Sequence, residues 1–201
     1  MPPALTLKIG GPAAAVPPFL LADGSGPPRQ RTTATVQATS EALTLAFVCD
    51  DTDAWGTLKG RDAPVYEEEC VEVFLAPGEA DPKDYFEFEL SPLGAFFDGR
   101  IHNPTGRRES MSADLEWSAR GAAWKAAVDA ARARWTAEIR LPWAGLGYPN
   151  GVARPRAWRL NLYRIDRPRD GSPVEYSCWS PTLATPANFH VPSRFGTLRL
   201  T

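Results

Sequence analysis

Apolar and polar residues alternate along many short stretches of the chain, which is the pattern of half-buried β-strands. In one stretch, Val71, Val73 and Leu75 fall on one face. The intervening Glu72 and Phe74 fall on the other, because side chains alternate along a strand. The pattern predicts strands at Ala4–Ile9, Thr33–Thr39, Ala42–Cys49, Cys70–Ala76, Tyr85–Leu90, Ala95–Asp98, Ala123–Asp129, Arg134–Leu141, Trp158–Ile165, Glu175–Trp179 and Gly196–Leu200.

Turn-forming residues separate these stretches. Twenty prolines and sixteen glycines break the chain into short pieces, as expected for many strands joined by turns. No internal repeat or long linker divides the chain, and we expect Gly10–Pro18 and Gly24–Pro28 to be loops. The sequence therefore predicts a single all-β domain over residues 1–201. Its expected architecture is an antiparallel β-sandwich, jelly-roll or immunoglobulin-like, with about ten or eleven strands.

A helix competes with a strand in only one place, the alanine-rich segment Arg120–Arg134, because alanine favours helix. Within it, Trp124, Ala126 and Val128 alternate with more polar residues, which favours a strand. Pro142–Leu146 is compatible with a single helical turn, since proline suits the first turn of a helix.

Composition and charge limit the kinds of partner that the sequence gives reason to expect. The 201 residues are 43% hydrophobic and 23% charged, with 22 basic against 24 acidic residues and a net charge of −2. This balance gives no reason to expect nucleic acid or a membrane as a partner. The first residues, MPPALTLKIGG, lack the features of a signal peptide. We therefore expect a cytoplasmic protein unless a leader was removed.

The three cysteines, Cys49, Cys70 and Cys178, each lie in an expected strand and lack the close spacing of zinc ligands. Unpaired cysteine is often found in protein cores, so buried free thiols are the favoured interpretation. A disulfide between Cys49 and Cys70 stays open.

Tyr66 and the acids that follow it carry the first sign of function. The segment YEEECVEVFL places an aromatic ring and three consecutive acids just before a strand whose outer face carries Glu72. An aromatic ring packs on the C–H face of a sugar, and a nearby carboxylate fixes its hydroxyl groups. A saccharide is therefore the first ligand to consider.

Glu72, Glu87 and Glu89 share the same outward parity on two strands that are expected to be neighbours. Paired carboxylates are the machinery of glycoside hydrolases. Outward glutamates on strands are more often solvated surface residues. The sequence favours the solvated alternative, with the hydrolase kept as a minor one.

Read together, several segments resemble the family 9 carbohydrate-binding modules, in particular a family 9-like branch found in bacterial proteins. The order and spacing of these segments carry the resemblance. They are ALTLAFVCDDTD (Ala42–Asp53), YEEECVEVFLAP (Tyr66–Pro77), YFEFELSPLGAFFD (Tyr85–Asp98), WTAEIRLPWAGLG (Trp135–Gly147), WRLNLYRID (Trp158–Asp166), WSPT (Trp179–Thr182) and FHVPSRFGTLRL (Phe189–Leu200).

The resemblance implies a β-sandwich and a non-catalytic sugar site. In sugar-binding members two aromatic rings sandwich the sugar, and the matching positions are Tyr66 and Phe189. Glu72 matches a carboxylate that accepts hydrogen bonds from sugar hydroxyls. Glu89 stands where the sugar binders carry a basic residue, which changes the hydroxyl pattern that can be satisfied.

Asn188 and His190 flank Phe189 and are expected at the rim of the same site. Related sandwiches bind haem through His and Met, but both histidines of this chain, His102 and His190, lie in loop-like segments beside prolines. We expect neither haem nor another cofactor.

The DDTD segment, with Asp50, Asp51 and Asp53, follows an expected strand. Calcium takes carboxylate oxygens from such loops and occurs in the family, while aspartate is also an ordinary turn residue. Structural calcium stays open. Arg164 is expected to be a buried arginine paired with Asp166 or Glu175, and lining the cleft is its alternative role.

The sequence thus predicts non-catalytic binding of a mono-, oligo- or polysaccharide, in carbohydrate catabolism and beside a glycoside hydrolase. The alternatives are a scaffold or interaction domain that has lost the sugar site and, less favoured, a glycoside hydrolase.

Overall fold

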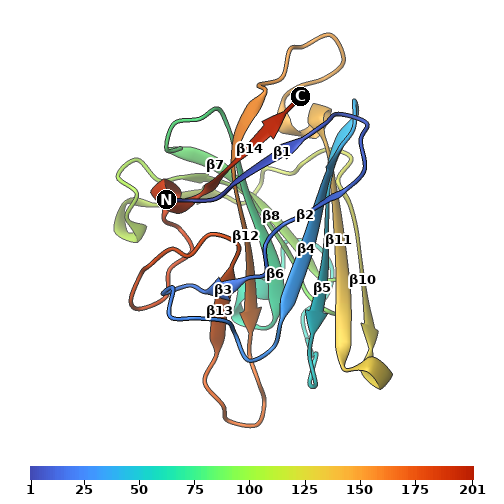
Figure 1. Ribbon diagram of the computed structural model, residues 1–201, viewed down its shortest axis with the longest axis vertical. Coiled ribbons are helices and arrows are strands. Elements are labelled where there is room, and N and C mark those ends of the chain that lie inside the picture. The colour runs from blue at the N-terminus through green and yellow to red at the C-terminus, as the bar shows by residue number, and fades with distance from the viewer.

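The computed structural model describes residues 1–201, which form two β-sheets packed face to face (Figure 1). The larger sheet has nine strands and the smaller has five. In the larger sheet the main path is β1 (Ala4–Leu7), β14 (Gly196–Leu200), β12 (Ala157–Asp166), β6 (Cys70–Pro77), β7 (Asp84–Leu90), β8 (Phe96–His102) and β9 (Ser112–Asp114), with β13 (Glu175–Cys178) on β12 and β3 (Leu20–Leu21) on β13. The smaller sheet runs β10 (Ala123–Asp129), β11 (Arg134–Pro142), β5 (Ala42–Asp50), β4 (Thr32–Ala38) and β2 (Ala14–Ala15).

All strand pairs are antiparallel except β1 with β14. The predicted antiparallel β-sandwich is therefore confirmed, and every strand expected from the alternation is present. The structure adds the very short strands β2, β3 and β9, which are too brief to leave a pattern.

Helical structure is limited to single 3₁₀ turns. They are η1 (Val65–Glu67), η2 (Arg108–Ser110), η3 (Ala130–Arg132), η4 (Trp143–Leu146) and η5 (Pro192–Arg194). The turn expected at Pro142–Leu146 corresponds to η4, and the alanine-rich segment forms β10, as its alternation predicts. None of these turns has the length of a membrane-spanning helix.

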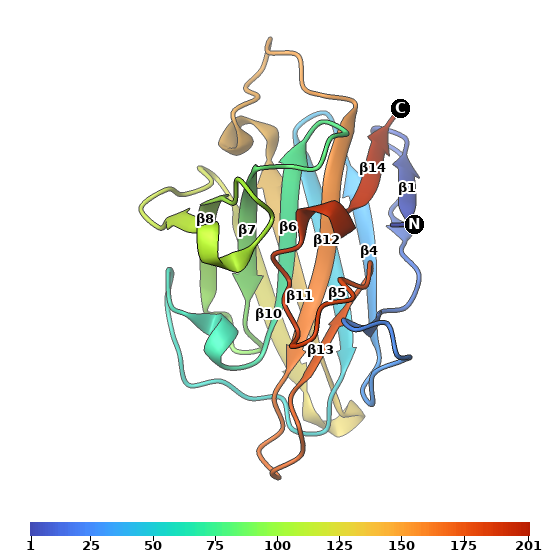
Figure 2. The same ribbon diagram turned by 90° about the vertical axis from the view of Figure 1, so that its left-hand side faces the viewer.

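The main core lies between the sheets, and Val71, Val73 and Leu75 of β6 point into it. A second apolar cluster covers the outer face of the larger sheet, where Phe74 and Tyr163 are fully buried. Figure 2 shows this face with loops in front of the strands. Both faces of β6 are therefore covered, which decides the environment of Glu72.

Candidate functional site

A cavity of about 340 Å³ opens among the loops that cover the outer face of the larger sheet. Its lining is aromatic and apolar on several sides and acidic at one point. The lining residues are Tyr66, Glu72, Glu87, Glu89, Phe97, Ile101, Arg108, Met111, Ala113, Leu115, Ile165, Tyr176, Ala187, Asn188, Phe189 and His190.

All six residues expected at the sugar site line this one cavity. They are Tyr66, Glu72, Glu89, Asn188, Phe189 and His190. Tyr66 comes from η1, the two glutamates from β6 and β7, and the other three from the loop that precedes η5. The fold thus gathers residues more than 100 positions apart in the sequence.

The two aromatic residues differ in exposure. The Tyr66 side chain is exposed and meets Phe97 edge to face, with 6.2 Å between ring centroids. Phe189 is buried and stacks on Tyr163 at 4.2 Å, while Tyr176 meets it edge to face. One face of the Phe189 ring is therefore already covered. Tyr66 offers the more accessible surface for stacking.

The acids of the cavity are buried, so the solvated interpretation of their outward parity is wrong. Glu72 and Glu89 lie directly opposite each other on β6 and β7, and Glu87 follows on the same face. They are 2%, 1% and 6% exposed, respectively. One carboxylate oxygen from each lies within 4.8 Å of the others. The second apolar cluster and the loops above it exclude the solvent that an outer strand face normally meets.

Burial raises the pKa of all three acids. It raises the pKa of Glu87 to about 7, and it raises the pKa values of Glu72 and Glu89 well above the usual range, with repulsion from neighbouring carboxylates adding to both. Few hydrogen bonds stabilise the ionised carboxylates and so oppose this rise in their pKa values. The Tyr66 backbone N–H donates to Glu89 at 3.1 Å, and the Cys70 thiol donates weakly to Glu72 at 3.6 Å.

His190 closes one side of the cavity. Its Nδ1 lies 2.8 Å from the Tyr85 hydroxyl, and its Nε2 lies 3.8 Å from Glu87 Oε1. Burial, with help from Arg108, lowers the pKa of His190 to about 4, so the ring is neutral at neutral pH. The Asn188 side chain accepts from the His190 backbone N–H at 3.0 Å and so fixes the loop.

Several lining residues were not predicted as site residues. Phe97 and Tyr176 carry strand patterns that gave no sign of a cavity, and Arg108 and Met111 come from an irregular segment between β8 and β9. Glu87 could have been included, because it shares the parity of Glu72 and Glu89. Arg108 and Asn188 also border a second hollow of about 590 Å³ with no apolar residue in its lining.

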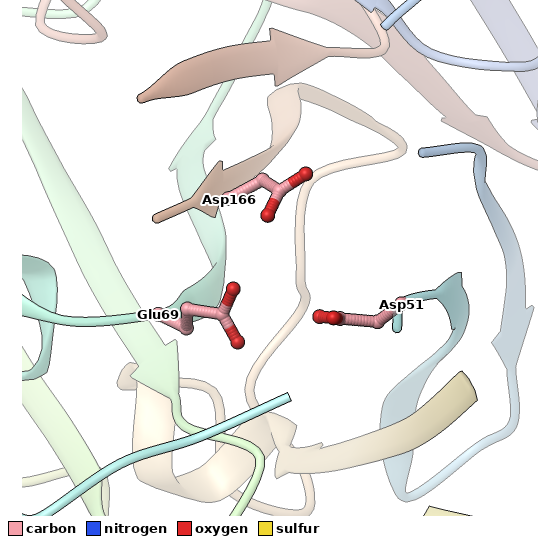
Figure 3. Close-up of side chains that lie close together, drawn as sticks. All are labelled: Asp51, Glu69 and Asp166. Carbon is pink, nitrogen blue, oxygen red and sulfur yellow. The ribbon is translucent and has the colours of Figure 1, made fainter. Parts of the chain in front are cut away.

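A second cluster of buried acids lies at the end of the sandwich where β5, β6 and β12 meet. Asp51, Glu69 and Asp166 point toward one another there (Figure 3), with oxygens within 4.8 Å. Burial and the charge of Asp51 raise the pKa of Glu69 to about 8. Arg164 Nη2 reaches Asp51 at 2.8 Å and Asp166 at 3.8 Å.

This cluster is the predicted buried arginine pair, with Asp166 as one partner and Asp51 as a second. Glu175, the other expected partner, instead pairs with Arg29 at 3.0 Å. Because Asp51 follows a strand of the smaller sheet and Arg164 belongs to the larger one, the pair joins the two sheets.

Protein groups satisfy the acids around Arg164. Backbone N–H groups of Asp53, Trp55 and Arg167 donate to Asp51 and Glu69. The side chains of Trp135 and Gln30 donate to Asp51 and Asp166. Every carboxylate oxygen of the cluster thus has a donor, and a guanidinium already lies in contact with two of the acids. This arrangement does not fit a metal site.

The remaining acids of the DDTD segment diverge. Asp50 pairs with Arg134 at 3.4 Å, and Asp53 pairs with Arg169 at the surface. The three aspartates therefore do not converge on one point. The cysteines are all buried and free, so the alternative disulfide between Cys49 and Cys70 is not formed.

Comparison with known proteins assigns the chain to a family. The model of the carbohydrate-binding family 9 matches residues 28–200. The chain therefore belongs to carbohydrate-binding family 9.

Solved structures share the fold at low sequence identity. A candidate carbohydrate-binding protein from Bacteroides uniformis ATCC 8492 matches with a TM-score of 0.77 and 16% identity, covering 99% of each chain. A family 9 carbohydrate-binding module from Caldicellulosiruptor kristjanssonii, solved with cellotriose, matches with a TM-score of 0.62 and 11% identity, covering 98% of this chain and 93% of the other. The structure of that species' module with glucose matches equally well, covering 98% and 95%.

A curated relative is an extracellular protein of Arthroderma benhamiae (strain ATCC MYA-4681 / CBS 112371). It is 28% identical over 140 residues, which cover 65% of this chain. The matched region spans 60% of the length of that relative.

Proposed function

We propose that the protein is a non-catalytic carbohydrate-binding module that holds a saccharide in the cavity beneath Tyr66. The exposed Tyr66 ring stacks on the sugar, and Phe189 supports it from the side of the cavity. Glu72 accepts hydrogen bonds from sugar hydroxyls, while Glu89, Asn188 and His190 line the rim. The role fits carbohydrate catabolism beside a glycoside hydrolase.

One observation carries this proposal, namely the meeting of an exposed aromatic ring and buried polar groups in a single cavity of about 340 Å³. Ligand sites are concave and mostly apolar, with a few polar groups that fix orientation. Family membership supports the same function, as do the Caldicellulosiruptor kristjanssonii structures solved with cellotriose and glucose. The adjoining polar hollow leaves room for a longer saccharide.

The test is a glycan screen followed by titration calorimetry on the wild type and on Tyr66→Ala. Loss of the stacking ring is expected to weaken binding at least tenfold, about 1.4 kcal/mol. Since Tyr66 is exposed, its removal should leave the melting temperature nearly unchanged. Leu93→Ala is the matched control, because it removes another exposed apolar side chain away from the cavity.

Phe189→Ala is a poor test of the same idea. Its ring is buried against Tyr163 and Tyr176, so truncation costs folding stability as well as any contact with ligand. If the wild type binds no saccharide in the screen, the proposed function fails. The interaction-domain alternative, favoured by Glu89 at a position that is basic in sugar binders, would then lead.

A hydrolase is the remaining alternative, and the distances give it a specific basis. One carboxylate oxygen from each of Glu72, Glu87 and Glu89 lies within 4.8 Å of the others, and retaining glycosidases also use two neighbouring carboxyl groups. Release of a chromophore from an aryl glycoside, and its loss in Glu72→Gln, would establish hydrolysis. A binding module shows neither.

A further inference from the structure

No arginine or lysine forms an ion pair with the acids of the cavity, although the charge of Arg108 partly opposes the raised pKa values of Glu72 and Glu87. Glu72, Glu87 and Glu89 bring three buried carboxyl groups within 4.8 Å. Arg108 lines the same cavity but is exposed and forms no ion pair with any of them. The neighbouring His190 ring is neutral at neutral pH. Like charges at this distance in a buried site repel strongly.

Glu87 is the most informative of the three. Its side chain is more than nine-tenths buried and lines the cavity, yet no backbone N–H, hydroxyl or cationic side chain donates to it. His190 Nε2, at 3.8 Å, is too far for a hydrogen bond. The neighbouring Glu89 carboxyl hydrogen-bonds Glu87, and that bond depends on a proton held between two acids. Once that proton leaves, a cation from outside the protein is needed to compensate the two charges. The cavity supplies the space for one.

Titratable or charged groups from several elements face the three acids. They are Tyr66 on η1, Cys70 on β6, Tyr85 on β7, Arg108 on η2, Tyr163 on β12, Tyr176 on β13 and His190 in the loop before η5. Burial raises the pKa values of Tyr66, Tyr85, Tyr163 and Cys70 and lowers the pKa of His190, so these five groups carry no charge at neutral pH. The raised pKa values of the three glutamates therefore mean that they hold protons in a place where no cation pairs with them.

The rest of the lining indicates which cation fits. Tyr66, Phe97, Phe189 and Tyr176 surround the cavity with aromatic rings, and Met111 adds a thioether. A hydrated divalent metal ion would meet apolar groups on most sides, whereas aromatic faces attract organic ammonium groups and pack on sugar rings. One ligand satisfies both parts of the lining, a sugar ring that carries an ammonium group.

We propose that the cavity selects amino sugars, with the ring packed against Tyr66 and the ammonium group held among Glu72, Glu87 and Glu89. This inference rests on the proposed function and names the substrate class of the same cavity. It also accounts for Glu89, because an acid at that position opposite Glu72 builds a cation site where a basic residue would prevent one.

The proposal predicts that ligand binding changes the protonation of the three glutamates. The glutamates must release their protons to hold an ammonium group, so binding near neutral pH should release protons into the buffer. Affinity should rise as the pH increases from about 5 to about 7 and fall again where the ammonium group itself loses its proton. A neutral sugar would show no such maximum.

The experiment is calorimetry on the whole chain with glucosamine and its β-1,4-linked oligomers. Glucose, N-acetylglucosamine and the matching neutral oligomers serve as comparison ligands. At pH 7 the amino sugars should bind at least tenfold more tightly than their acetylated counterparts. Titrations in two buffers with different ionisation enthalpies should reveal the released protons. Glu87→Gln should remove most of the amino-sugar preference.

Glu67→Gln is the matched control, since it makes the same change at an exposed glutamate beside Tyr66 that does not line the cavity. It should leave the preference intact. Melting temperatures of both variants show whether each is folded.

Three results would overturn the inference. If neutral sugars bind as tightly as amino sugars and Tyr66→Ala abolishes that binding, the proposed function stands and the amino-sugar selectivity is wrong. If binding requires added Ca²⁺ or Mn²⁺ and EDTA abolishes it, the acids hold a metal ion instead. If no saccharide of either kind binds, the proposed function falls together with the inference.

Discussion

Two groups of three buried acids each include residues of the larger sheet and differ in what surrounds them. The first, Asp51, Glu69 and Asp166, contains Arg164 and receives a hydrogen bond at every carboxylate oxygen. The second, Glu72, Glu87 and Glu89, has no cation in contact and opens into a cavity. We call them the arginine cluster and the cavity cluster.

The two clusters differ as a structural group of acids differs from a ligand site. Burying a charge is costly unless it is paired and hydrogen-bonded. The arginine cluster meets that cost with groups of the protein itself, so it stabilises the sandwich and needs nothing more. The cavity cluster has no cationic partner and avoids that cost by holding protons, which a cationic ligand in the adjoining cavity would replace.

The largest effect should come from removing the cation of the arginine cluster. Arg164→Met leaves acids buried without their charge partner, and breaking a buried pair in this way costs about 3–5 kcal/mol. For a domain of this size that corresponds to a fall in melting temperature of roughly 6–20 °C. Thermal and urea unfolding at pH 7 measure it.

Arg169→Met is the matched control, because Arg169 also pairs with an aspartate of the DDTD segment but lies at the surface. Because solvent screens this pair, the substitution should leave the stability nearly unchanged. If Arg164→Met does not fold, Arg164→Lys retains the charge and should fold with an intermediate stability. Equal stabilities of Arg164→Met and Arg169→Met would remove the distinction between the two clusters.

A smaller effect should come from the cavity cluster, and it should depend on pH. The pKa of Glu87 is raised from 4.5 to about 7 in the folded protein. The folded state therefore holds a proton that the unfolded state releases, and stability falls as the pH rises from about 4.5 to about 7. Glu87→Gln removes this titration. Between pH 5 and pH 8, stability should shift in favour of the variant by on the order of 2 kcal/mol.

Urea unfolding of the wild type, Glu87→Gln and Glu67→Gln between pH 5 and pH 8 tests whether the titration of Glu87 lowers the stability of the folded protein. The exposed Glu67→Gln variant should keep the wild-type slope. A wild type whose stability rises through this range, with Glu87→Gln following it in parallel, would show that Glu87 is ionised and already compensated.

Most of the fold could be predicted from the sequence because the core between two sheets imposes a strict alternation. β5, β6 and β11 each keep apolar residues on one face, and their positions followed from that pattern. Even the alanine-rich β10 was identifiable, since Trp124 and its alternate neighbours face the core. Strands of two or three residues carry no comparable signal.

The site could be predicted only where a resemblance or a shared parity pointed to it. Tyr66, Glu72 and Phe189 were found in this way, and they line one cavity. The burial of Glu72 and Glu89 could not be predicted, because it depends on loops that fold back over the outer face and leave no periodic trace. Arg108 and Met111 come from such a loop.

The smallest effect should come from calcium at the arginine cluster. A calcium ion in hundredfold excess over its dissociation constant would stabilise the fold by about 2.7 kcal/mol, or roughly 5–11 °C in melting temperature. Because Arg164 and the surrounding donors already compensate the acids, we expect calcium and EDTA to give melting temperatures within about 1 °C of each other. A rise of several degrees with calcium that disappears in Asp51→Asn would show that an acid-rich cluster can hold both an arginine and a metal ion, and the rule separating the two clusters would fail.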